Sequence, residues 1–227
     1  MNQANARPAQ PRLAATVVVL RPLPSGLDAL MVRRNTALSF CGGDWVFPGG
    51  AVDAGDFDVH PISIRAAAFA GSRELREEAG LMLDPDDLVH WSRWITPSSL
   101  PRRYDTHFFI AAAPGDQEPT IVEGEVTAMH WLPVVGWPEL STSGPFPVPQ
   151  PTQIVLREIA EAFERYGSLE VLLQRERGRV IQCFMPKMCE EARAALPWDL
   201  EYSRLPDEGI AWNQNDIVAR RHWPSRF

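Results

Sequence analysis

The apolar run Leu13–Leu20 narrows the fold of this 227-residue chain more than any other segment. It contains four β-branched residues in a row, which favours a buried strand. An apolar run near the start of a sequence could also be the core of a signal peptide. Arg21 and Pro22 follow this run directly, however, and no small-residue cleavage site is present, which favours the strand. After the turn sequence Pro-Ser-Gly, the run Leu27–Arg33 predicts the second strand of a hairpin.

The rest of the chain mixes strand and helix signals. Residues 51–60 are predicted to form a polar loop, and residues 179–227 an irregular, Trp-rich region. Gly80 suits the left-handed position that ends a helix. Strands are expected at Trp45–Phe47, Val89–Trp94, Thr106–Ala113 and Val126–Leu132, and helices at Ser63–Ala79, Thr152–Arg165 and Ser168–Arg177. Strands first, with one helix packed among them and more helices later, indicate an α+β fold.

Three regions are expected along the chain. Residues 1–11 are polar and contain prolines, so we predict a disordered tail. Residues 12–143 form the main domain. The Pro-rich connector that begins at Gly144 leads into a helical C-terminal extension, 144–227, packed on the same domain.

Composition argues against several classes of protein. A net charge of −7 without a block of like charges disfavours nucleic-acid binding and docking on an anionic membrane. No segment approaches 18 consecutive apolar residues, so no membrane span is expected. Three cysteines, an odd number, predict reduced thiols and a cytoplasmic protein.

The segment Arg73–Leu81 carries the chemistry. On a helix, Glu74, Glu77 and Glu78 stand at i, i+3 and i+4 and project from one face. Like charges at i and i+4 cost roughly 0.2–0.5 kcal/mol in an isolated helix, so a compensating cation is expected. Mg²⁺ and Mn²⁺ take such oxygen ligands and keep open positions for substrate phosphates. For the glutamates alone, a solvated charged helix face stays the alternative.

At these residues the sequence resembles the Nudix hydrolase family. The Nudix motif is G-x5-E-x7-R-E-U-x-E-E-x-G-U, where U is a bulky aliphatic residue. Residues 73–81 match its second half at every fixed position, and Gly50 and Asp56 match the first half with Asp in place of Glu. Sixteen residues, 57–72, separate Asp56 from Arg73 where the motif has seven, so nine extra residues (16 minus 7) are inserted. We expect residues 57–62 to form a surface loop.

The resemblance covers about residues 13–140 and implies an α/β/α sandwich with a mixed sheet. It implies that Glu74, Glu77, Glu78 and the carbonyl of Gly50 bind the metal, and that Arg73 orients the glutamates. Asp56 occupies the position of the first glutamate of the motif, whose role in the family is minor. Glu125, or with less favourable spacing Glu123, is the expected extra ligand or general base, with an ordinary loop glutamate as the alternative.

The implied reaction is hydrolysis of a diphosphate, a pyrophosphohydrolase activity. Metal ions neutralise the diphosphate and acidify a water, a glutamate accepts its proton, and the water attacks phosphorus. Candidates for gripping substrate phosphates are four arginines, for which ordinary surface charge is the alternative: Arg33, Arg34, Arg102 and Arg103. Cys41 lies near the motif, but no base partner is evident.

The substrate is less sharply defined. A coenzyme A-cleaving subgroup carries L-L-T-x-R-[SA]-x3-R-x3-G-x3-F-P-G-G before its metal site. The spacing fits from Arg34 to Gly50, although Asn35 and Ser39 replace the small residue and the second Arg. The insertion, together with Leu196–Asp199, resembles the Nudix-19-type branch. Three hypotheses follow: a coenzyme A or acyl-CoA diphosphatase, a hydrolase of another nucleotide (ADP-ribose, NADH, a sugar nucleotide or a dinucleoside polyphosphate), and a non-catalytic ligand sensor. A homodimer stays open.

Overall fold

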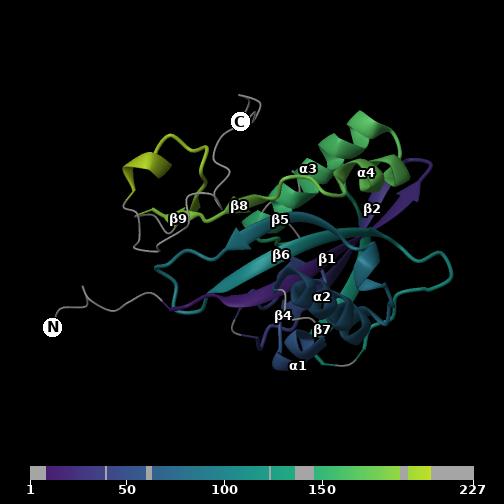
Figure 1. Cartoon of the computed structure of the whole chain (residues 1–227), viewed down its shortest axis with the longest axis horizontal. Coiled ribbons are helices and arrows are strands. Elements are labelled where there is room, and N and C mark those ends of the chain that lie inside the picture. Colours follow the sequence, from purple (N-terminus) through teal and green to yellow (C-terminus); the bar gives the residue numbers. More distant parts are fainter. Residues whose placement is uncertain are drawn as a thin grey trace.

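A mixed sheet forms the middle of the molecule, with helices on both of its faces (Figure 1). The computed structural model describes residues 9–38, 40–59, 63–122, 124–135, 146–189 and 194–205. The strands are β1 (Arg12–Leu23), β2 (Gly26–Arg34), β3 (Trp45–Val46), β4 (Gly49–Ala51), β5 (Val89–Ile95), β6 (Tyr104–Ala112), β7 (Val126–Pro133), β8 (Gln182–Phe184), β9 (Lys187–Met188) and β10 (Ala194–Ala195). The helices are α1 (Ala54–Val59), α2 (Ser63–Ala79), α3 (Gln150–Tyr166) and α4 (Leu169–Glu176), with 3₁₀ turns at Pro85–Asp87 and Tyr202–Arg204.

The main sheet has the order β3-β2-β1-β6-β5-β8, with β4 paired to β1 and β7 paired to β2. The β1–β6 and β5–β8 pairs are parallel, and the other pairs of this sheet are antiparallel. β9 and β10 form a separate two-stranded sheet. The hairpin that the sequence predicted is present, because Leu20 in β1 pairs with Ala29 in β2.

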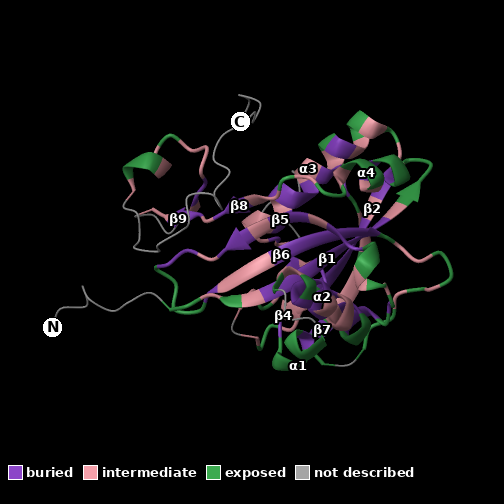
Figure 2. Ribbon diagram, viewed as in Figure 1, coloured by how far each residue is buried: buried purple, intermediate pink, exposed green. Residues whose placement is uncertain are grey.

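β1 is buried on both of its faces, which explains why its sequence is apolar without alternation (Figure 2). Val17 and Val19 belong to the core under α2. Val18 and Leu20 point the other way, into the core under α3 and α4. The expectation of an α+β fold, an α/β/α sandwich, is therefore confirmed.

Small residues let α2 lie close to the sheet. Ala66, Ala67, Ala70 and Gly71 are buried on the sheet side of this helix. A Cβ added at Gly71 would lie 2.9 Å from the Cγ2 of Val17, so this position has room only for hydrogen. The close packing fixes the helix, and with it the glutamates on its other side.

The C-terminal extension supplies the second helical layer. Val155 and Ile159 of α3 and Leu172 of α4 are completely buried against the sheet. Gly167, with a φ of 69°, ends α3, and the hydroxyl of Ser168 accepts from Val171 N to begin α4. Residues 150–176 thus complete the sandwich.

Two predictions for irregular segments are wrong. Residues 51–60 contain the end of β4 and the helix α1, instead of a polar loop. Residues 57–59 of the expected surface loop are exposed but helical, and residues 60–62 lie outside the described residues. Asp56 stabilises this helix start, because its carboxylate accepts from Asp53 N at 2.9 Å. The region after residue 179 contains β8, which extends the main sheet, and β9 and β10.

No helix among the described residues is long and apolar enough to cross a bilayer.

Candidate active site

The Gly49–Gly50 turn faces the glutamates of α2. Gly49 N donates to Oε2 of Glu78 at 2.9 Å. A Cβ added at Gly50 would overlap the carboxylate of Glu74, so this glutamate lies directly against the backbone of the turn. The two halves of the sequence motif therefore meet in space.

Hydrogen bonds and close packing hold this turn against β1. Pro48 O accepts from Val17 N at 2.9 Å and from the Thr16 hydroxyl at 2.8 Å. A Cβ added at Gly49 would lie 2.6 Å from the Cα of Thr16, which no side chain could tolerate. Glycine is required here because two strands touch.

Arg73 holds the larger group of carboxylates. Its guanidinium lies 2.9 Å from Glu74, 3.1 Å from Glu77 and 3.1 Å from Asp56. It also donates to Ala51 O at 3.1 Å. Asp56, in the position where the motif has Glu, is buried and binds Arg73 through both oxygens. The nine-residue insertion therefore leaves the first acidic position in contact with the helix.

Arg34 contacts two further carboxylates. Its guanidinium lies 3.1 Å from Glu125 and 4.0 Å from Glu78. Arg34 comes from the end of β2, and Glu125 immediately precedes β7, the strand that pairs with β2. The pairing of these two strands thus brings Glu125 to the glutamates of α2. Glu123, the other glutamate considered for this role, lies outside the described residues.

The site carries an excess of negative charge. Six carboxylates contact two guanidiniums: Asp53, Asp56, Glu74 and Glu77 contact Arg73, and Glu78 and Glu125 contact Arg34. Burial raises the pKa of Glu78 to about 7 against the hydrogen bond from Gly49, and the nearby Glu74 adds to the shift. Burial likewise raises the pKa of Glu74. A bound cation would relieve both effects.

The carboxylates are not yet arranged around one point. Among the residues that the structure describes, no three His, Cys, Asp or Glu side chains converge as a metal site would require. The reason is visible in the hydrogen bonds, since Arg73 holds Glu74 and Glu77 while Gly49 holds Glu78. Arg73 contacts Oε1 of Glu74 and Oε2 of Glu77, so the second oxygen of each carboxylate could face a cation while Arg73 holds the first.

A cavity of about 630 Å³ opens beside the turn. Gly50 and Glu74 line it from one side, and Arg34 and Glu125 also reach it. This volume is in the range of small-molecule and cofactor sites, roughly 300–1,000 Å³. The acidic residues and the cavity therefore form one continuous site.

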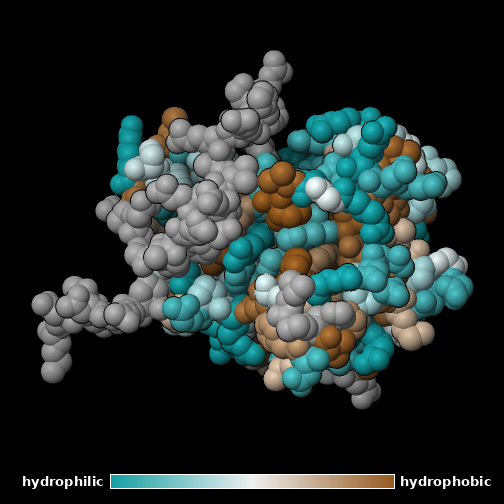
Figure 3. Space-filling view, in the orientation of Figure 1, coloured by the Kyte–Doolittle hydropathy of each residue, from teal (hydrophilic) through white to brown (hydrophobic). Residues whose placement is uncertain are grey.

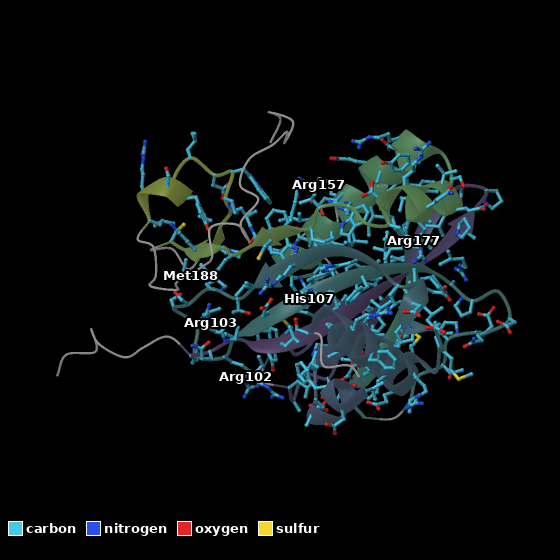
Figure 4. All side chains as sticks on the ribbon, viewed as in Figure 1. Arg102, Arg103, His107, Arg157, Arg177 and Met188 are labelled. Carbon is cyan, nitrogen blue, oxygen red and sulfur yellow. The ribbon has the colours of Figure 1, made fainter. Side chains whose placement is uncertain are left out.

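The structure separates the four arginines expected to bind phosphates. Arg34 and Arg102 line the cavity. Arg33 is exposed and donates to Gly43 O at 3.2 Å. Arg103 is buried and donates to the backbone carbonyls of Thr96 and Ala9, so the expectation that it grips substrate is wrong. Figure 4 shows Arg102 and Arg103 as neighbours at the start of β6.

Cys41 is unsuited to nucleophilic chemistry, as the sequence suggested. Burial raises the pKa of its thiol to about 11, and Asp44 adds to the shift. The thiol therefore stays protonated at neutral pH, whereas the thiolate is the nucleophile. Ser39, which replaces an arginine of the coenzyme A motif, lies outside the described residues.

Sequence reasoning missed the apolar wall of the cavity. Trp94 and Ile95 at the end of β5 line it, together with Met188 and Ala194. The last two residues belong to the C-terminal segment, by which we mean residues 182–189 and 194–205. No periodic pattern marks these residues, because they come from segments that are far apart in the chain. Only the tertiary fold brings them together.

Comparisons with known proteins agree with this geometry. Residues 10–140 match the family model of the NUDIX domain, which is more than half of the chain. The Caenorhabditis elegans protein named "Putative nudix hydrolase 7" is 25% identical over 183 residues, 62% of this chain and 60% of that protein. The match thus spans less than two thirds of that relative.

Solved structures share the fold. A NUDIX hydrolase from Alicyclobacillus acidocaldarius has a TM-score of 0.64 and 24% identity, covering 76% of this chain and 99% of that one. The NUDIX domain of Shewanella oneidensis NrtR, solved with ADP ribose, has a TM-score of 0.52 and 18% identity, covering 71% and 98%. The family match, the fold and the joined halves of the motif lead to one conclusion: the chain belongs to the NUDIX domain family.

Proposed function

We propose that this protein is a divalent-metal-dependent pyrophosphohydrolase that cleaves the diphosphate of a nucleotide derivative. The observation that carries the proposal is the meeting of two α2 glutamates, Glu74 and Glu78, with the Gly49–Gly50 turn at the edge of a cavity. A charged helix face in solvent would not need such a turn against it. The burial of Glu78 and Asp56 also argues against that alternative.

The residues present suit a hard divalent cation. Glu74, Glu77, Glu78 and the carbonyl of Gly50 would hold it, and oxygen is the donor that Mg²⁺ and Mn²⁺ prefer. The six carboxylates exceed the two guanidiniums by four formal charges (6 minus 2) before any protonation of Glu78. When bound, the cation would neutralise the diphosphate and lower the pKa of a water.

The protein's own side chains supply the rest of the chemistry. Glu125 lines the cavity and is the proposed acceptor of the water proton. Arg34 can exchange its carboxylate partners for phosphate oxygens, because a guanidinium binds either pair of oxygens in the same planar geometry. Arg102 lines the same cavity and is the second proposed phosphate ligand.

Coenzyme A or an acyl-CoA is the favoured substrate. The spacing from Arg34 to Gly50 supports this choice, and Arg34 does line the cavity beside the turn. The second candidate is another nucleotide such as ADP-ribose, supported by the NrtR domain of similar fold that was solved with ADP ribose. A non-catalytic sensor is the candidate from a different class. The full set of Arg73, Glu74, Glu77 and Glu78 argues against it.

A substrate panel tests the proposal. CoA, ADP-ribose, NADH, a dinucleoside polyphosphate and a nucleoside triphosphate are incubated with Mg²⁺ or Mn²⁺, and the products are separated by chromatography. We expect cleavage of at least one diphosphate, highest kcat/KM for CoA, and no activity after chelation. Binding without turnover of any compound would favour the sensor.

The variant Arg34→Ala tests the substrate preference. We expect it to lower kcat/KM for CoA more than for ADP-ribose or NADH, by about ten- to hundred-fold, the equivalent of one charge-assisted hydrogen bond of roughly 1.5–3 kcal/mol. An equal loss for all three substrates would remove the support for CoA and leave the general activity standing.

A further inference from the structure

The cavity extends well beyond the carboxylates. Its acidic end contains Gly50, Glu74 and Glu125, whereas its other walls are mostly apolar. Trp94, Ile95 and Phe108 of the sheet line these walls and are almost completely buried. A diphosphate at the acidic end would fill only part of this volume.

The C-terminal segment closes the apolar end. Pro186, Met188 and Ala194 line the cavity there. Figure 4 shows Met188 at the same end of the molecule as Arg102 and Arg103, although 85 residues separate it from Arg103 (188 minus 103). Arg103 contacts the sulfur of Met185 at 3.9 Å, which ties this segment to the start of β6.

Buried polar contacts hold the C-terminal segment in place. The ammonium of Lys187, itself 6% exposed, donates to Tyr202 O at 3.3 Å and to Leu205 O at 3.1 Å. The hydroxyl of Tyr202 donates to Met185 O at 2.8 Å. β9 and β10 pair across the segment. Hydrogen bonds and strand pairing therefore hold this wall of the cavity in a defined conformation.

We propose that the apolar end of the cavity binds an extended aliphatic chain carried by the substrate, and that Met188 and Ala194 determine which chains fit. This inference rests on the proposed function, because the diphosphate of the same molecule must lie at the glutamates. It assigns the C-terminal segment a role in specificity. The chemical class is a nucleoside diphosphate ester with a long, mainly apolar arm, such as an acyl thioester.

The aromatic residues of the cavity favour a chain over a nucleotide base. Stacking of a base needs an available ring face. Phe47, Trp94 and Phe108 of the lining are almost completely buried, so they leave little ring face open for a base. An aliphatic chain needs only apolar surface, which these walls provide.

Chain length provides the first test. Burial of one methylene is worth about two- to four-fold in affinity in a groove that is partly open. We therefore expect kcat/KM to rise from CoA to acetyl-CoA to octanoyl-CoA, by about 60-fold or more between the two thioesters, which differ by six methylenes, while ADP-ribose gives a reference without a chain.

Filling the apolar end of the cavity provides the second test. Ala194→Trp places a large ring in the apolar end, and Met188→Asp puts a charge on the same wall. Each should lower kcat/KM for octanoyl-CoA by at least about ten-fold and leave ADP-ribose hydrolysis within about two-fold of wild type. Leu200→Trp is the matched control, because Leu200 is 92% exposed in the same segment and does not line the cavity. Circular dichroism confirms folding, and Met188→Asp decides if Ala194→Trp does not fold.

The outcomes separate this inference from the proposed function. Turnover of ADP-ribose and CoA without any effect of chain length would overturn the chain site and leave the hydrolase standing. An equal loss for ADP-ribose and octanoyl-CoA in both variants would assign the wall to the nucleotide instead. No turnover of any diphosphate would reject the hydrolase itself.

Discussion

Glu77 and Glu78 are neighbours on α2 but have different surroundings. Glu77 is exposed and pairs with Arg73, whereas Glu78 is buried and accepts from Gly49. Glutamine keeps the size and one acceptor oxygen but removes the charge. We predict that Glu77→Gln and Glu78→Gln each lower kcat by several orders of magnitude while circular dichroism and the Tm stay close to wild type. Glu170→Gln, on the exposed side of α4, is the control, and near-normal turnover in either α2 variant would reject the metal assignment.

The two glycines of the turn should respond differently to the same substitution. In Gly49→Ala the added methyl meets the backbone of β1, which cannot move, so we predict a loss of about 1–3 kcal/mol and a Tm lower by several degrees. In Gly50→Ala it meets only the flexible end of Glu74, so the Tm should change little while kcat falls sharply. Gly115→Ala, in open space, is the control for thermal unfolding and turnover. Equal Tm losses at both positions would show that the turn is not held as described.

Sequence alone placed Glu74, Glu77 and Glu78 together on one helix, because a helix makes i, i+3 and i+4 neighbours whatever surrounds it. It misjudged Arg103, since an arginine in the chain carries no sign of whether backbone carbonyls or solvent will surround it. It also could not reveal that Arg34 contacts Glu78 and Glu125, which depends on the pairing of β2 with β7.

At the scale of elements, the helix α1 contacts the candidate site through the side chain of Asp56, which binds Arg73. We predict that Asp56→Asn weakens the contacts to Arg73 and lowers the free energy of unfolding by about 1–3 kcal/mol. Phe57→Ser, one residue along the same helix, should change it by less than about 0.5 kcal/mol, because Phe57 is 39% exposed. Urea unfolding measures both. A larger effect of Phe57→Ser would mean that the outer side of α1 is covered in solution.

A buried carboxylate in α3 makes the stability of the sandwich depend on pH. Glu158 accepts from the indole of Trp91 at 3.0 Å, and burial raises its pKa to about 7, against the opposing effect of Arg179. The carboxyl group of Glu158 thus binds a proton more tightly in the folded state than in the unfolded chain. Its contribution to stability is complete below pH 4.5 and is lost as the pH rises through 7.

The variant Glu158→Gln tests this dependence. Glutamine is neutral at every pH and still offers an oxygen to Trp91, so we predict that the Tm of the variant relative to wild type is higher at pH 8 than at pH 5. The comparison uses thermal unfolding at both values. A difference that does not change with pH would show that Glu158 keeps an ordinary pKa.

Long elements were predictable from sequence and short ones were not. α2 begins and ends at the expected residues, because it is long, has an Ala-rich buried side and ends at Gly80, which has a φ of 67°. β4 is only three residues long and owes its strand geometry to pairing with β1. Such a segment shows no period of its own, and the same holds for β8–β10.

At the scale of the whole molecule, metal binding should appear as stability. If Mg²⁺ or Mn²⁺ binds the folded protein alone, a free concentration about 100-fold above Kd adds about 2.7 kcal/mol to the free energy of unfolding. We predict a Tm higher by several degrees with Mn²⁺ than with EDTA, and a smaller shift in Glu78→Gln. Differential scanning calorimetry provides the measurement. The same shift in the variant would place the cation elsewhere.

The surface gives little guidance to function, and the cavity could not have been predicted. Figure 3 shows one face of the molecule. Hydrophilic residues cover most of the described part of this face, and hydrophobic residues form separate small patches. The cavity is formed by β1, the Gly49–Gly50 turn, Glu74 of α2, the end of β5, the start of β6, the start of α3 and the C-terminal segment. Each contributes a few side chains, so the pocket has no signature in any one stretch of sequence.

The position of α3 and α4 has a consequence for the gene. The family match ends at residue 140, before the helices that cover Val18, Leu20 and Trp91. A nonsense codon placed between positions 141 and 149 would leave every residue of the catalytic motif translated. The product would nevertheless expose the face of its sheet that α3 and α4 cover, and protein quality control would meet an aggregating polypeptide in place of a folded protein.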